Sequence, residues 1–190
     1  MSTNRQKSFI ATLELDEHHV DFLGGLYGTP ALRHDTLFSG GFFTGATRRQ
    51  DDSHLLGRRL RSEVKNIAPL NIYFRCTDDY YHLYIRSHET YTGHCISKDA
   101  AGVLGAFPAA GGDTTTFNLQ SLQNRTMTLD NMAKDIQRVR LKARNSGHIG
   151  AVLRRGAPYS YLAGIEKEGI VFKLRILERN APYLSNPDEI

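Results

Sequence analysis

The segment from residue 138 to residue 144 could bind an anion. It carries a basic residue at every second position: Arg138, Arg140, Lys142 and Arg144. On a β-strand these four side chains would project from one face, a spacing that suits a polyanion. Two further basic residues would extend the predicted anion-binding surface: Arg154 and Arg155. The alternative is an exposed strand whose charges keep it soluble and guard it against edge pairing.

A second set of residues has the chemistry of a sugar-binding site. Sites of this kind hold hydroxyl groups with a few polar side chains and stack an aromatic ring on the ligand. Acceptors and rings occur side by side in the run Asp78-Asp79-Tyr80-Tyr81. The predicted ligand-binding residues are Asp78, Asp79, Tyr81, His88, Tyr91, Asn145 and His148. The alternative for the Asp78-Asp79 segment is a simple hairpin turn.

The histidines show no metal-ligand spacing. His82, His88 and His94 lie six residues apart, and no Cys-x-x-Cys or His-x-x-x-His pattern occurs. The chain also lacks the Gly-x-Ser-x-Gly, Walker and dinucleotide-binding motifs. We therefore expect no metal site and no cofactor. Two cysteines, Cys76 and Cys95, are too few for a disulfide framework and suggest a reduced, buried pair.

Composition limits the class of protein. The chain has 190 residues, 40% hydrophobic and 23% charged, which suits one folded domain over residues 1–190 with flexible ends at 1–8 and 181–190. No apolar run approaches the ~20 residues of a membrane helix, so no span is expected. The first residues lack the apolar region of a secretory signal, so we expect a cytoplasmic protein, or one secreted without a cleavable signal.

The positive charge is concentrated in the C-terminal third. The net charge is +4, but residues 125–180 contain 12 Lys and Arg against 5 Asp and Glu, a local +7. An anionic partner would therefore meet this part of the chain.

The elements that must position these residues read as strands. Residues 71–76 and 81–86 are apolar runs joined by a turn, and residues 172–176 alternate apolar and basic side chains. Residues 130–135 suggest a short helical turn before a strand over 139–144, and residues 16–23 suggest a helix. Similar segments end at Asn66, Asn124 and Asn180, which are 58 and 56 residues apart. This spacing predicts three units of about 57 residues.

Residues 139–180 carry the most specific pattern. Val139-Arg140-Leu141-Lys142-Ala143-Arg144 runs into the turn Asn145-Ser146-Gly147, and Tyr161-Leu162-Ala163-Gly164 and Phe172-Lys173-Leu174 follow. This order resembles a β-trefoil repeat of the fascin and lectin sort. The resemblance implies an all-β barrel of three pseudo-repeats and a non-catalytic module that binds a glycan or a protein surface. Because Trp is absent, the Gln-x-Trp motif of ricin-type sugar-binding units is absent too.

A weaker resemblance covers residues 26–54. Leu26-Tyr27-Gly28-Thr29-Pro30, then Leu37-Phe38-Ser39-Gly40-Gly41-Phe42 and His54, are similar to the start of ADP-ribosyltransferase toxins. That resemblance implies an α+β fold and an NAD-consuming effector, degenerate or active. The chain departs from the family because Gly28 stands where an NAD-contacting Arg or His is expected. The catalytic Gln/Glu-x-Glu pair is also missing. We therefore expect a binding module, with this enzyme and a polyanion-binding domain as the alternatives.

Overall fold

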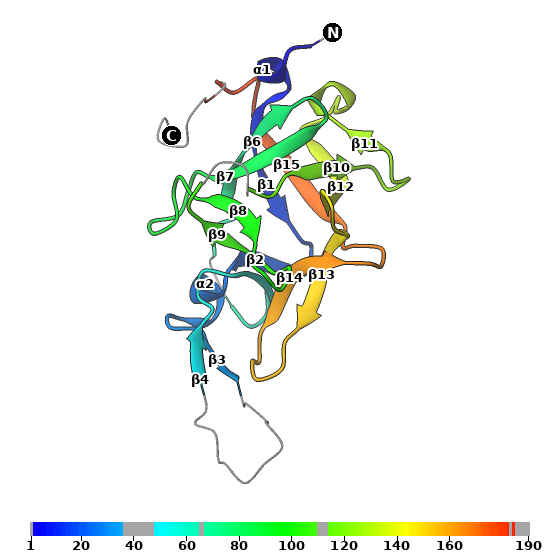
Figure 1. The fold of residues 1–190 in the computed structure, drawn as a ribbon. Coiled ribbons are helices and arrows are strands. Elements are labelled where there is room, and N and C mark those ends of the chain that lie inside the picture. The colour runs from blue at the N-terminus through cyan, green and yellow to red at the C-terminus, as the bar shows by residue number, and fades with distance from the viewer. Residues whose placement is uncertain (1, 36–47, 65–66, 110–113, 183, 185–190) are drawn as a thin grey trace.

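Six antiparallel strands close a barrel in the computed structural model (Figure 1), which describes residues 2–35, 48–64, 67–109, 114–182 and 184. In pairing order they are β1 (Phe9–Glu14), β6 (Asn71–Thr77), β7 (Tyr80–Ile85), β10 (Phe117–Gln120), β12 (Ile136–Ala143) and β15 (Phe172–Arg179). The last strand, β15, pairs with β1, which closes the barrel and removes its open edges. The prediction of an all-β fold is confirmed.

Three hairpins pack against the barrel and against one another. They are β2 (His18–Phe22) with β5 (Leu56–Leu60), β8 (Cys95–Lys98) with β9 (Leu104–Phe107), and β13 (His148–Leu153) with β14 (Ser160–Ile165). β14 also pairs with β5, while isolated bridges join Leu55 to Gly105 and Val103 to Ala163. Each hairpin therefore contacts the other two, and together they form a cap that shares the core of the barrel.

The chain repeats one order of elements three times: a barrel strand, a cap hairpin and a second barrel strand. The three units run from β1 to β6, from β7 to β10 and from β12 to β15, over residues 9–77, 80–120 and 136–179. They are unequal in length, unlike the units of about 57 residues that the asparagine spacing predicted. Asn124 and Asn180 do follow the last strands of their units, with positive φ angles of 59° and 53°. Asn66 lies outside the described residues, and Asp78, with a φ of 56°, follows the last strand of the first unit.

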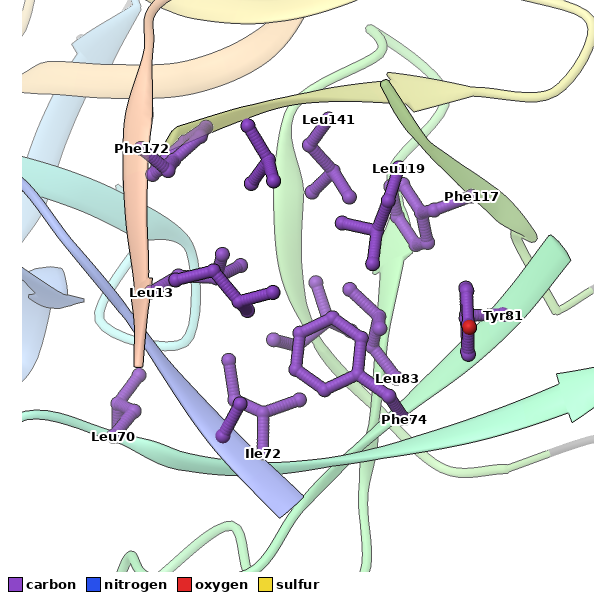
Figure 2. Close-up of a cluster of buried hydrophobic side chains, with 14 of the residues drawn as sticks. Leu13, Leu70, Ile72, Phe74, Tyr81, Leu83, Phe117, Leu119, Leu141 and Phe172 are labelled. Carbon is purple, nitrogen blue, oxygen red and sulfur yellow. The ribbon is translucent and has the colours of Figure 1, made fainter. Parts of the chain in front are cut away.

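Side chains that alternate along the barrel strands fill the interior. On β12, Val139, Leu141 and Ala143 are buried, and the basic residues between them belong to the opposite face. Figure 2 shows core side chains that converge from all six strands, among them Leu13, Phe74, Leu83, Phe117, Leu119, Leu141 and Phe172. An apolar cavity lined by Leu13, Leu83, Leu141, Phe172 and their neighbours has a volume of only about 10 Å³, roughly one water molecule. The barrel is a packed core and not a ligand channel.

The short elements correct one prediction and confirm another in part. A 3₁₀ turn, Leu129–Asn131, follows β11 (Thr126–Met127) and precedes β12, but it covers only the first two residues of the predicted turn over 130–135. The helix predicted over residues 16–23 is instead the strand β2, because all five of its residues pair with β5. The α-helices of the described residues are α1 (Asn4–Lys7) and α2 (Leu23–Tyr27). Two helices of this length do not make the α+β fold of the alternative.

Both ends of the described chain pack on the barrel. Where we expected a flexible end at residues 1–8, α1 forms, and the side chain of Asn4 accepts a hydrogen bond from the backbone N–H of Asp78 at 3.0 Å. The backbone N–H of Ala181 donates to the carbonyl of Ser8, and the hydroxyl of Tyr73 donates to the carbonyl of Pro182. Residues 185–190 of the other predicted flexible end lie outside the described residues.

A long insertion between β2 and β5 covers the outside of the cap. It contains α2 and the hairpin of β3 (Leu32–Asp35) and β4 (Arg48–Asp51), and it forms a second apolar cluster with β14. A buried ionic contact fixes it there: Arg33 Nε and the hydroxyl of Tyr161 both donate to Asp52 Oδ2, at 3.0 and 2.7 Å. Burial, followed by this bond to Asp52, raises the pKa of Tyr161, so its hydroxyl remains a donor at neutral pH.

Removing the Asp52 carboxylate should loosen the insertion. Asp52→Ala leaves the buried guanidinium of Arg33 without this carboxylate, and we expect a loss of about 3 kcal/mol in the free energy of unfolding. Tyr161→Phe removes one hydrogen bond and should cost about 1 kcal/mol. Urea denaturation measures both, with Asp79→Ala, at an exposed position, as the control. Equal stability of Asp52→Ala and Asp79→Ala would contradict this account of the insertion.

Candidate functional site

The basic residues of β12 share a face, as predicted, but they do not form a row of four exposed cations. Arg140 is only 8% exposed, and its guanidinium donates to the carbonyl of Leu122 at 2.8 Å and pairs with Glu168. Arg138 pairs with Asp16 at 2.8 Å. These carboxylates neutralise much of the charge that was predicted to bind a polyanion.

The other predicted anion-binding residues are spread over different surfaces. The guanidinium of Arg144 lies over the ring of Tyr80, 4.3 Å from its centroid. Arg154 pairs with Asp99 at 3.5 Å, and Arg155 is exposed in the turn between β13 and β14. Lys142 lies at the end of β12 and lines a groove described below.

The predicted sugar-binding residues fall into four places. Asp78 and Asp79 are exposed in the turn between β6 and β7, and the carbonyl of Asp79 accepts a hydrogen bond from the side chain of Asn118. Tyr81 is 0% exposed, and its hydroxyl accepts from the backbone N–H of Leu129 at 3.1 Å. Tyr81 is therefore a core residue and is not part of a surface site.

The structure brings His88 and Tyr91 together in the connection between β7 and β8. Their rings stack with centroids 4.7 Å apart, and both rings contact Phe22 from the cap. The neighbouring Asp21 is buried, which raises the pKa of its carboxyl group. The rings of this connection pack on one another and on the cap.

Asn145 and His148 belong to the third unit, where the barrel meets the cap. Asn145 lies in the turn between β12 and β13 with a φ of 58°, and His148 begins β13. An open groove of about 620 Å³ lies beside this turn. It is lined by Lys142, Ser146, Gly147, His148, Gly164, Ile165 and Glu166. A groove of this volume is within the range of small-molecule sites.

Two glycines give the groove its floor. A Cβ atom on Gly147 would lie 1.7 Å from the carbonyl oxygen of Ile165, and one on Gly164 would lie 2.5 Å from the hydroxyl of Ser146. At Gly147 the near atom belongs to the backbone, so only glycine lets the turn after β12 lie directly on the end of β14. The side chains of Lys142 and Glu166 then contribute to the same groove from different elements.

His148 is held in place at one wall of the groove. Its Nε2 lies 2.7 Å from Oε1 of Gln120, a pairing that places a proton on Nε2 because a carbonyl oxygen only accepts. Burial, and then the positive charges of Lys142 and Arg140, lower the pKa of His148 from its ordinary value of 6.5. The imidazole is therefore neutral at pH 7.

The corresponding position of the first unit is occupied, and the second unit differs in its β7–β8 connection. His148 pairs with Ile165, as His18 pairs with Leu60 in the first unit, so the next residues, Glu166 and Arg61, correspond. Arg61 reaches back over its turn and donates to the carbonyls of Leu15 and Asp16, at 3.1 and 3.2 Å. In the second unit the corresponding connection holds the stacked rings of His88 and Tyr91.

The sequence did not identify half of this groove. Gly164 and Ile165 end the cap strand β14, Glu166 follows it, and only the pairing of β13 with β14 brings them to His148. The pairing of apolar runs with turn residues predicts a hairpin there, but it does not predict which side chains share a groove.

Comparisons with protein-family models, with curated proteins and with solved structures find no match for this chain. Only the geometry and chemistry of the site therefore bear on function. Within the residues that the structure describes, no group of three His, Cys, Asp or Glu could hold a metal ion. None of the helices in this part of the chain is long and apolar enough to cross a membrane.

The titration of His148 checks the electrostatics of the groove. We expect its pKa in the folded protein to lie below 6.5, so the stability it contributes is present above about pH 6.5 and is lost as the pH falls below that value. Imidazole NMR signals followed from pH 8 to 5, assigned with His148→Gln, measure this pKa. A value at or above that of the unfolded chain would show that burial and the two cations do not govern the site.

Proposed function

We propose that this chain is a non-catalytic binding module with the arrangement of a β-trefoil. The observation that supports the trefoil is the order of elements in each unit, in which a cap hairpin separates two neighbouring barrel strands. Closure of the barrel and mutual contact of the three hairpins are what a threefold arrangement requires. Binding, in this proposal, takes place on the surface where barrel and cap meet.

The ligand we propose is a neutral glycan in the groove of the third unit. The groove presents a donor from Lys142, an acceptor from Glu166 and the hydroxyl of Ser146, and a sugar hydroxyl both donates and accepts hydrogen bonds. Ile165, beside the two glycines, offers a small apolar surface to the C–H face of a ring. The single observation that carries this proposal is the convergence of balanced charge and apolar surface in one open groove.

Balanced charge favours a glycan over the polyanion of the alternative. Lys142 and Glu166 line the same groove, and Glu168 neutralises the buried Arg140 behind it. A polyanion would approach these carboxylates as well as the cations, at an electrostatic cost.

The ADP-ribosyltransferase alternative has no support in the described residues. Tyr27 ends the helix α2, and its ring lies between Arg59, 4.6 Å away, and Tyr159, 4.7 Å away. A strand would have to end at this tyrosine in that family. Residues 37–42, which carry the rest of the resemblance, lie outside the described residues, and His54 contacts Phe107.

Substitutions in the groove should weaken the binding of a glycan. On a glycan array we expect the protein to bind a small set of neutral oligosaccharides. Lys142→Ala and Glu166→Gln should each weaken the best of them by about tenfold, since each removes a charge-assisted hydrogen bond of ~1.5 kcal/mol or more. Arg138→Ala, on the same face of β12 but outside the groove, is the matched control and should bind as wild type. An array without any signal would overturn the proposal and leave a protein surface as the partner to seek.

Arg61 closes the junction of the first unit, and the groove residues Lys142, His148 and Glu166 all belong to the third unit, so we predict one binding site of this kind per chain. Isothermal titration of the best oligosaccharide should give a stoichiometry of one, and its affinity should change little between 50 and 500 mM salt because the ligand is neutral. Two or three equivalent sites would contradict the assignment to the third unit. An affinity that falls steeply with salt would instead support the alternative of polyanion binding.

A further inference from the structure

The turn between β13 and β14 exposes an apolar side chain next to two cations. Leu153 is 80% exposed, whereas the next most exposed large hydrophobic residue of the described chain, Leu177, is 49% exposed. Arg154 and Arg155 follow it directly in the turn. Isolated apolar residues on a surface are common. The exposure of this leucine therefore indicates a binding surface only if its neighbours contribute to one.

The β3–β4 hairpin lies against this turn. The backbone N–H of His34 donates to the carbonyl of Gly156 at 2.9 Å. Gly156 has a φ of 80°, and a Cβ atom there would lie 1.9 Å from the carbonyl oxygen of His34. The two hairpins are therefore in direct backbone contact, and both project at the same end of the molecule in Figure 1, below the cap.

The second hairpin adds more exposed cations to this end. All four residues of β4 are exposed, and Arg48 and Arg49 form the half that pairs with Asp35 and His34. Asp35 pairs with Arg33, and Asp99 pairs with Arg154, while Asp51 keeps its negative charge because the hydroxyl of Ser53 is a neutral partner. Arg48 and Arg49 outnumber Asp51 on β4, and Arg155 lies in the facing turn, so this end of the molecule keeps a small surplus of positive charge.

We propose that this end docks on an anionic lipid bilayer. The docking surface, here called the hairpin-tip surface, consists of the exposed residues Leu153, Arg155, His34, Arg48 and Arg49. Arginines near a membrane attract acidic headgroups, and an aliphatic side chain gains free energy when it leaves water for the acyl region. A nucleic acid would use the cations but would leave Leu153 in water, so the combination of charge and exposed leucine favours a bilayer.

This surface is separate from the proposed glycan groove. His148 and Leu153 begin and end the strand β13, which places the two surfaces about 17 Å apart along the hairpin at the usual rise per residue. The two proposals stand on different residues, so either can fail without the other.

The test is sedimentation with vesicles. We expect the full chain to bind vesicles of phosphatidylcholine with 30% phosphatidylserine, with binding at least tenfold weaker to phosphatidylcholine alone and weakened by 500 mM salt. Leu153→Asp and the pair Arg48→Glu with Arg49→Glu should each reduce binding by about tenfold or more. The matched control is Leu122→Asp with Arg125→Glu, an exposed leucine and arginine in the β10–β11 turn, and it should bind as wild type.

Each other result overturns the proposal. Absence of binding, equal binding to neutral vesicles, or an equal loss in the Leu122 and Arg125 control would each exclude the hairpin-tip surface. If only the arginine substitutions act and duplex DNA binds as tightly as the vesicles, the surface is a general cation patch and not a membrane site. Circular dichroism and urea denaturation of every variant, with wild-type values expected at these exposed positions, separate loss of binding from loss of fold.

Discussion

Backbone pairing between β1 and β15 joins the two ends of the chain, from Phe9 beside Arg179 to Glu14 beside Lys173. Without it, the six barrel strands would form an open sheet with two unpaired edges, and inward residues such as Leu13 and Leu174 would lose their cover. Closure also fixes where each cap hairpin begins and ends, because each hairpin leaves one barrel strand and returns to a strand paired with it. The cap, the insertion and the groove all depend on this constraint.

The proposed site follows from the junction between barrel and cap. Lys142 lies one residue before the end of a barrel strand, His148 begins a cap strand, and Glu166 begins the return to the barrel. The same junction exists in every unit, but Arg61 occupies it in the first unit, and aromatic rings occupy the corresponding connection in the second. A threefold scaffold can thus offer a different surface at each junction, because the side chains differ from one unit to the next.

Much of the fold was predictable from the residues. The alternation of Val139, Leu141 and Ala143 with basic residues predicted the inward face of β12, and the apolar runs on either side of Asp78 predicted β6 and β7. The burial of Tyr81 could also have been predicted, because alternate residues of a strand share a face and Tyr81 shares one with Leu83 and Ile85.

The chemistry of the site was less predictable than the fold. The sequence placed Asn145, His148 and Lys142 in one stretch, but the position of Glu166 depends on the pairing of β13 with β14. The pairing of Arg140 with Glu168 likewise depends on elements far apart in the chain. A local pattern shows which residues alternate, and tertiary contacts decide which charges remain exposed.

The central claim, one glycan groove in the third unit, is tested most directly by NMR chemical-shift mapping with an array-selected oligosaccharide. The account predicts shifts confined to the backbone amides of residues 142–148 and 164–168, and shifts centred on His88 and Tyr91 would contradict it.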